Sequence, residues 1–197
     1  MRIKYWMTLS VPLAVMLCQQ TATAQQDNLL RYISCHGGRK FAVVESDFSA
    51  KRFSRSVKTS QGSIEIVVLH GVSLHIAYAG TPFVNFKVEH LEGYALAKQS
   101  LIDNLSVMAK GTRDMESTTP QESLLDGFDV YSIERTKLSG GVQSVYLLFR
   151  DADETVVTLY ILNTPREAPQ FSTVEQYFAL TGEFIQAYTS CVAENLK

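Results

Sequence analysis

The stretch FDVYSIERTKLSGGVQSVYLLFRDADETVVTLYIL, residues 128–162, decides the fold of this chain. It contains three runs that are rich in β-branched and aromatic residues: Phe128–Arg135, Gln143–Phe149 and Thr155–Leu162. The runs are separated by LSGG at 138–141 and DADE at 151–154, and both segments have the composition of hairpin turns. The stretch therefore predicts a meander of three antiparallel strands.

Two more strand patterns precede this meander. Apolar alternation predicts one strand over Lys40–Phe48. A second pattern covers Ser63–His70 and Ser73–Tyr78 and is interrupted by Gly71, so it fits either a hairpin or one bulged strand. The segment Lys51–Gly62 between the two patterns is polar and basic, and we expect a loop there.

Two amphipathic helices are expected, one on each side of the meander. Before it, apolar residues at spacings of three and four predict a helix from Leu91 to Lys110, with the stripe Leu91, Tyr94, Ala97, Leu101, Leu105 and Met108. After it, STVE at 172–175 has the capping-box pattern, in which Ser172 caps the helix and Glu175 bonds back to it. The stripe of this last helix predicts core packing rather than a ligand-binding row, and consists of Val174, Tyr177, Thr181, Phe184, Tyr188 and Cys191.

The order of these elements predicts an α+β fold, in which a mid-chain helix and a long C-terminal helix pack on an antiparallel sheet. The chain has no internal repeat, no low-complexity tract and no long linker. We therefore expect residues 25–197 to form a single α+β domain, which suits a segment of this length.

Over about residues 85–195 the order of elements and the texture of the strands resemble the Mog1/PsbP-like fold. The strands GFDVY at 127–131 and SVYLLF at 144–149, and the closing helix that ends in residues 184–191, carry this resemblance. These segments include no motif that is diagnostic of that fold. The resemblance implies an accessory or binding factor without catalytic residues, and it transfers no active site to this chain.

Residues 1–24 have the three parts of a signal peptide in the right order. Arg2 and Lys4 precede an apolar run at 7–18, and ATA at 22–24 offers a small-x-small cleavage site. The run has about 12 residues, fewer than the roughly 20 that span a bilayer as a helix. Leu17 stands where a lipoprotein signal has a small residue, which argues against lipidation of Cys18. We expect a cleaved signal peptide and a periplasmic or secreted protein that does not span the membrane.

The chain left after cleavage would be mildly acidic. Without Arg2 and Lys4, 16 of the 18 basic side chains remain against 20 acidic ones, a net charge of about −4. Such a chain lacks the basic stripe that binding to a phosphate backbone requires. The composition therefore argues against a nucleic-acid partner.

Cys35 and Cys191 are the two cysteines that follow the predicted signal peptide. In an oxidising compartment this pair predicts one disulfide, which would clip the N-terminal segment to the last helix. Closing a loop of this length stabilises a fold by at most about 5 kcal/mol in the chain-entropy model. Redox or metal chemistry is less favoured, because CHGG at 35–38 lacks the second cysteine of a C-x-x-C motif. Two free thiols are the remaining alternative.

We find no catalytic or metal-binding motif in the sequence. The four histidines, at 36, 70, 75 and 90, include no i, i+4 pair, and His70 and His75 would point to opposite faces of a regular strand. GVSLH at 71–75 lacks the last glycine of a nucleophile elbow, and the acidic turn at 151–154 lacks the later ligands of a calcium loop. We predict no catalytic, cofactor-binding or metal-ligating residue.

One neighbourhood of the chain is locally basic. It consists of CHGGRK at 35–40 together with Lys51, Arg52, Arg55 and Lys58. Such residues could bind an anionic lipid, a glycan or an acidic patch of a partner. A solvated loop without a ligand is the alternative interpretation.

Three classes of function stay open. The first is a non-enzymatic accessory or binding protein of the cell envelope, which binds another protein or a surface polymer. The second is a small-molecule or lipid carrier with a cavity between sheet and helices, lined by Tyr94, Phe128, Tyr146 and Phe184. The third is an enzyme whose site is assembled from scattered residues, which a cleft with several strongly shifted pKa values would indicate. Export and the lack of a catalytic motif favour the first class.

Overall fold

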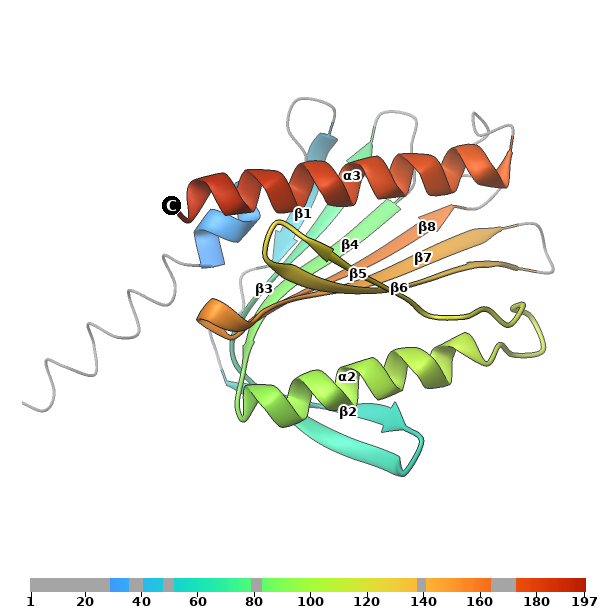
Figure 1. The fold of residues 1–197 in the computed structure, drawn as a ribbon, viewed down its shortest axis with the longest axis horizontal. Coiled ribbons are helices and arrows are strands. Elements are labelled where there is room, and N and C mark those ends of the chain that lie inside the picture. The colour runs from blue at the N-terminus through green and yellow to red at the C-terminus, as the bar shows by residue number, and fades with distance from the viewer. Residues whose placement is uncertain (1–28, 36–40, 48–51, 79–82, 138–140, 164–172) are drawn as a thin grey trace, which may run out of the picture.

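The computed structural model describes residues 29–35, 41–47, 52–78, 83–137, 141–163 and 173–197, so the predicted signal peptide lies outside the described residues. In these residues eight strands form one antiparallel sheet in the order β1-β3-β4-β8-β7-β6-β5, with β2 paired to β3 outside this order (Figure 1). The strands are β1 (Phe41–Asp47), β2 (Phe53–Thr59), β3 (Gly62–Tyr78), β4 (Phe83–Leu91), β5 (Gln121–Leu125), β6 (Phe128–Thr136), β7 (Val142–Arg150) and β8 (Thr155–Asn163). Two long helices, α2 (Tyr94–Ala109) and α3 (Val174–Asn195), complete the fold and confirm the predicted α+β class.

The predicted meander is confirmed as β6, β7 and β8, which pair in chain order. A further strand, β5, joins this meander through a two-residue turn at Asp126 and Gly127, whose φ angles are 50° and 84°. Both angles are left-handed, which is the geometry of the tight hairpin turn that matches the twist of a sheet. The sequence shows no strand pattern for β5, because its first four residues are all exposed at the edge of the sheet.

The region before α2 differs most from its prediction. β3 is one bulged strand whose register shifts between Val68 and His70, so the alternative of a hairpin at Gly71 is wrong. The loop expected at Lys51–Gly62 is also wrong, because β2 occupies most of that segment and pairs with the first part of β3. β2 reads as polar since most of its side chains face solvent, whereas Val57 packs against the core under α2.

The sheet curls around α2. Val68 of β3 pairs with Phe53 of β2 on one side and with Leu91 of β4 on the other. β1 and β2 therefore follow one another along the same edge of β3. The β2–β3 hairpin continues beyond β1 and passes beneath α2 (Figure 1). The helix is thus enclosed between the main sheet and this hairpin.

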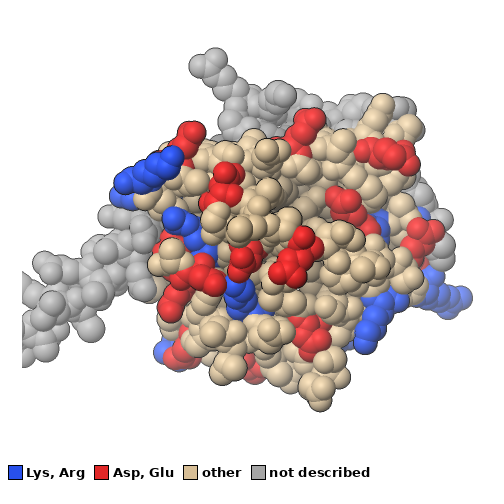
Figure 2. Space-filling model, viewed as in Figure 1, with Lys and Arg blue, Asp and Glu red and all other residues tan. Residues whose placement is uncertain are grey.

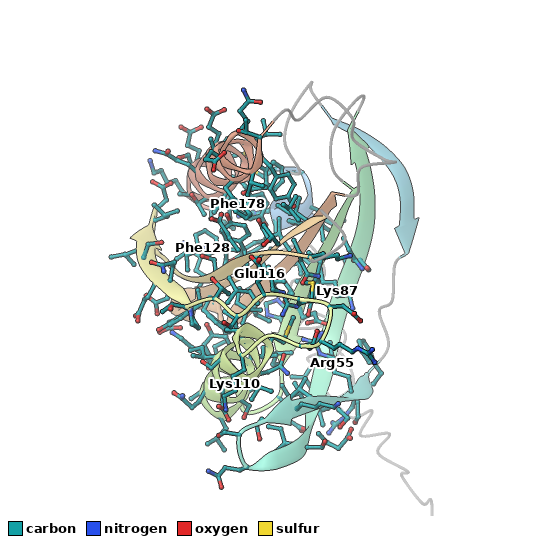
Figure 3. All side chains as sticks on the ribbon, turned by 90° about the vertical axis from the view of Figure 1, so that its right-hand side faces the viewer. Arg55, Lys87, Lys110, Glu116, Phe128 and Phe178 are labelled. Carbon is teal, nitrogen blue, oxygen red and sulfur yellow. A yellow bond between two sulfur atoms is a disulfide. The ribbon has the colours of Figure 1, made fainter. Side chains whose placement is uncertain are left out.

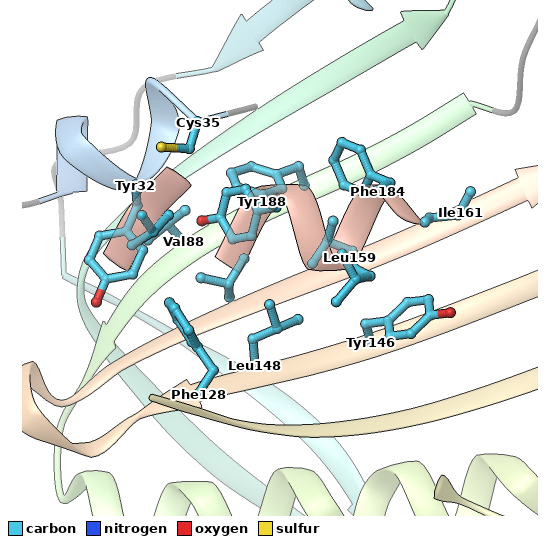
Figure 4. Packing of buried hydrophobic residues seen from close by; sticks show 14 of the residues in the cluster. Tyr32, Cys35, Val88, Phe128, Tyr146, Leu148, Leu159, Ile161, Phe184 and Tyr188 are labelled. Atoms are coloured by element: carbon cyan, nitrogen blue, oxygen red, sulfur yellow. The ribbon is translucent and has the colours of Figure 1, made fainter. Parts of the chain in front are cut away.

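The two helices cover opposite faces of the sheet, so the core has two layers (Figure 1). On one face α3 packs over a cluster of buried residues that includes Phe128 and Tyr188 (Figure 4). On the other face α2 packs over a second cluster, which includes Leu101 and Phe149. We call these the α3 cluster and the α2 cluster.

Both helices begin later than their sequence patterns indicate. α2 begins at Tyr94, because Leu91 is the last residue of β4, a strand that the sequence did not predict. α3 is capped by Thr173, since Oγ1 of Thr173 accepts a hydrogen bond from the backbone N–H of Gln176, and the predicted cap Ser172 lies outside the described residues. The core role expected for the α3 stripe is confirmed by its buried members, Tyr177, Thr181, Phe184 and Tyr188.

The predicted Cys35–Cys191 disulfide is present, with 5.7 Å between the two Cα atoms. It joins the N-terminal segment, which is helical at residues 29–33, to the C-terminal part of α3. Tyr32 of this segment is fully buried on the α3 side of the sheet (Figure 4). Within the described parts of the chain, no helix has the length and hydrophobicity needed to cross a membrane.

Candidate functional site

An open groove lies between the tip of the β2–β3 hairpin and α2, and we call it the hairpin–helix groove. Its volume is about 480 Å³, which falls within the roughly 300–1,000 Å³ of typical ligand sites. The groove is polar but contains one charged side chain, and it is lined by Thr59, Ser60, Gln61, Ile64, Gln99, Ser100, Ile102, Asp103 and Ser106.

Hydrogen bonds fix the two walls of this groove relative to each other. The backbone N–H and the hydroxyl of Ser60 both donate to Oδ2 of Asp103, each at 2.8 Å. Next to them, Nδ2 of Asn104 donates to the backbone oxygen of Lys58 at 2.7 Å. Because these bonds hold the hairpin tip to α2, a ligand would meet preformed walls and would pay less to order them.

The groove offers polar groups that the described part of the chain does not use itself. The side chains of Gln61 and Gln99 are exposed, and neither makes a hydrogen bond to another described residue. Each amide supplies two N–H donors and one oxygen acceptor. Ile64 and Ile102 are partly buried beside them and add apolar surface. The arrangement suits a neutral ligand that carries hydroxyl or amide groups and has an apolar side.

A second hollow, of about 30 Å³, lies on the inner side of α2, and we call it the inner cavity. Arg55 reaches it from β2, and Nη2 of Arg55 lies 2.6 Å from Oε2 of Glu89 (Arg55 is labelled in Figure 3). The side chain of Glu89 is only 4% exposed, and this burial raises its pKa. The cavity is lined by Arg55, Val57, Leu101, Asn104, Leu105, Met108, Val145, Leu147, Thr158 and Tyr160. It is about a tenth of the smallest typical site for an organic ligand.

The four aromatic residues that were expected to line a carrier cavity do not share one space. Tyr94 belongs to the α2 cluster, whereas Phe128, Tyr146 and Phe184 belong to the α3 cluster on the other face of the sheet. All four are buried. The expected lining therefore consists of two separate parts of packed core.

The acidic turn at 151–154 ties other elements to the sheet. Oδ1 of Asp151 lies 2.8 Å from Nζ of Lys98 and accepts a 2.8 Å hydrogen bond from the hydroxyl of Tyr94. Lys98 and Tyr94 hold the pKa of Asp151 below its ordinary value. On the other side, Oδ2 of Asp153 accepts a 2.6 Å hydrogen bond from Tyr32. Across the described ranges, no three His, Cys, Asp or Glu side chains come together in a way that could hold a metal ion.

The sheet brings His70 and His90 together. These two residues lie directly opposite each other on β3 and β4. His90 is buried, with Nδ1 3.3 Å from Oγ1 of Thr155, and burial lowers its pKa, so its ring is neutral at pH 7. His36 and the side chain of His75 lie outside the described residues. Predicting this pair from the sequence would have required the pairing register of β3 with β4.

Two arginines of the basic neighbourhood form ion pairs with glutamates. Arg52 lies 2.8 Å from Glu92, and Arg55 is paired with Glu89. These two arginines therefore tie β2 to the end of β4 and are not free cations. On the face shown in Figure 2, positive and negative side chains are interspersed. Lys58 is an exposed residue of β2, and the members at 36–40 and 51 lie outside the described residues.

No protein-family model, no curated protein and no solved structure matches this chain. The resemblance to the Mog1/PsbP-like fold therefore stays a prediction. The hairpin–helix groove is the candidate functional site, because its volume, fixed walls and free amides suit a ligand. The sequence did not indicate it, since the groove exists only where the β2–β3 hairpin wraps beneath α2, and β2 itself was expected to be a loop.

Proposed function

We propose that this chain is an exported, non-enzymatic accessory protein of the cell envelope, and that its hairpin–helix groove binds a neutral segment of a surface polymer. The observation that carries the proposal is the groove itself, with a volume of about 480 Å³ and free amides at Gln61 and Gln99. Hydroxyl-rich polymers such as glycans present the hydrogen-bonding groups and apolar sugar faces that this lining would complement.

The lining favours binding over catalysis. It contains no His, Cys, Lys or Arg, so it offers none of the usual partners of an activated nucleophile. Its one carboxylate, Asp103, already accepts two hydrogen bonds from Ser60. A ligand in the groove would therefore be held without a group poised to react with it.

Two observations support a location in the periplasm or outside the cell. Residues 1–24 have the pattern of a cleaved signal peptide. The Cys35–Cys191 disulfide is of a kind that persists in oxidising compartments. Together they motivate the search for a ligand among polymers of the envelope.

The proposal is tested by nuclear magnetic resonance on labelled protein recovered from its secretory compartment. Neutral glucan and N-acetylglucosamine hexamers are titrated, with an uncharged hexapeptide alongside. We expect saturable chemical-shift changes at residues 59–64 and 99–106 with at least one oligosaccharide. The double variant Gln61→Ala/Gln99→Ala should bind at least about tenfold more weakly, since it loses two hydrogen-bonding amides.

The matched control is Gln186→Ala, which removes an exposed amide from α3 on the other side of the sheet. It should bind like the unmodified protein. Shift changes with the peptide alone would make the ligand a segment of another protein. Saturable changes confined to residues outside the groove would overturn the assignment of the site.

A further inference from the structure

We propose that the inner cavity beneath α2 is a binding site for a small monovalent anion, of which chloride is the abundant example. The cavity lies between β2, α2 and the β7–β8 part of the sheet. This inference is independent of the hairpin–helix groove and of the function proposed for it.

The charges around the cavity do not balance. Lys87 pairs in register with Thr158, so it projects from the same face of the sheet as the cavity lining, and it acts electrostatically on Glu89. Arg55 and Arg135 both act on the hydroxyl of Tyr160, which lines the cavity. Arg55 lines the cavity, Lys87 and Arg135 act on groups in or beside it, and among the described residues Glu89 is the carboxylate that acts on Tyr160. An anion would compensate the excess positive charge.

Arg135 is the clearest uncompensated cation. It is 9% exposed, and its guanidinium donates to neutral acceptors, Oε1 of Gln143 at 2.6 and 2.8 Å and the backbone oxygen of Met108 at 2.7 Å. Among the described residues no carboxylate lies within ion-pair distance of it. Burying a charge without a counter-charge is costly, so a nearby anion would stabilise the fold.

Two buried polar atoms of residues that line the cavity have no partner in the part of the chain that the structure describes. Nε of Arg55 and Oγ1 of Thr158 are both inaccessible to solvent and make no hydrogen bond to a described residue. Thr158 is 98% buried, since its exposed fraction is 2%. Both groups can donate a hydrogen bond, so they suit a ligand that only accepts. The unpaired donors and the excess positive charge therefore both favour an anion as the ligand.

The size of the cavity restricts the ligand. About 30 Å³ exceeds the roughly 10–15 Å³ that one water molecule needs, and a halide ion is only slightly larger than water. Sulfate, phosphate and organic carboxylates are too large to be enclosed. Water would fill the space and satisfy the two donors, but it would leave the positive charge uncompensated.

The test compares thermal unfolding of the protein in sodium chloride and in sodium gluconate at equal ionic strength. Gluconate is too large for the cavity and screens surface charges equally. We expect chloride to raise Tm by roughly 3–6 °C once its concentration exceeds the dissociation constant tenfold, and the rise should saturate. Thr158→Val should abolish the difference between the salts, whereas Thr158→Ser, which keeps the hydroxyl, should retain it.

Crystals grown in bromide provide the direct observation. An anomalous peak within hydrogen-bond distance of Nε of Arg55 and Oγ1 of Thr158 would establish the site. Equal Tm values in chloride and gluconate, with water and no anomalous signal in the cavity, would overturn the proposal. A chloride effect that persists unchanged in Thr158→Val would also overturn it, because the effect would then arise elsewhere.

Discussion

The hydroxyl of Tyr32 donates a 2.6 Å hydrogen bond to Oδ2 of Asp153, a residue 121 positions later in the chain. Tyr32 lies three residues before Cys35, which is bonded to α3. The N-terminal segment is therefore held at two points, by a hydrogen bond to the β7–β8 turn and by a disulfide to the last helix. Both points are accessible to mutation.

Replacing Tyr32 with Phe should lower the free energy of unfolding by about 1–3 kcal/mol, because the partly buried carboxylate of Asp153 loses a donor and the fully buried ring position loses its polar contact. Urea denaturation of the full chain measures this change. Tyr131→Phe is the matched control, since its hydroxyl bonds to Glu122 at an exposed position and its loss should cost less than about 0.5 kcal/mol. Equal effects of the two variants would contradict the anchoring role of Tyr32.

The disulfide closes a loop with a sequence separation of 156 residues. The double variant Cys35→Ser/Cys191→Ser should lose up to about 5 kcal/mol of stability, the chain-entropy limit for so long a loop. Reductant should destabilise the unmodified protein similarly and leave the double variant unchanged. A midpoint of denaturation that reductant does not shift in either protein would show that the bond contributes no stability.

The two sides of α2 should respond differently to truncation. Leu101 is 4% exposed in the α2 cluster, whereas Leu96 is 80% exposed on the same helix. Leu101→Ala should cost about 2–5 kcal/mol through lost burial and a cavity. Leu96→Ala should change stability by less than about 0.5 kcal/mol. Similar costs would mean that α2 is rotated relative to the sheet.

The stability of the protein should fall as the pH drops below about 6.5, the ordinary pKa of histidine. Burial lowers the pKa of His90 in the folded protein, so below that pH the unfolded chain binds a proton that the folded chain does not. Thermal unfolding between pH 5 and 8 should show the slope, and His90→Phe should reduce it.

Glu89 contributes a slope of the opposite sign. Its pKa is raised above 4.5, so its contribution to stability is present below that value and is lost as the pH rises through its folded pKa. His90→Phe retains Glu89, and the difference between the two pH profiles therefore isolates His90. Identical profiles would mean that His90 titrates alike in the folded and unfolded states.

The fold was predictable in the meander, where long apolar runs are bounded by turn residues. β4 was not predicted although its Phe86, Val88 and Leu91 are buried, so burial alone does not mark a strand. β6, β7 and β8 bury residues from both of their faces, so apolar runs and turn residues mark them clearly. β2 and β5 left no such pattern because most of their side chains are exposed. The positions of β2 and β5 depend on their pairing with β3 and β6. The local pattern of apolar and polar residues does not show which strands pair.

The candidate sites were not predictable for a related reason. The hairpin–helix groove joins residues 59–64 to residues 99–106, and none of these belongs to a catalytic or metal-binding motif. The inner cavity depends on Arg55, which looked like part of a basic loop, and on Thr158 in a buried strand. Only the wrapping of the β2–β3 hairpin around α2 brings either set together.

Native mass spectrometry of the protein recovered from its own secretory compartment tests the central claim most directly. The account predicts a chain that begins at Gln25, gains two daltons on reduction, and carries an added neutral mass that leaves on denaturation. The added mass should be absent from Gln61→Ala/Gln99→Ala and present in Gln186→Ala. A chain that retains residues 1–24, or an added mass that the groove variant keeps in full, would contradict the account.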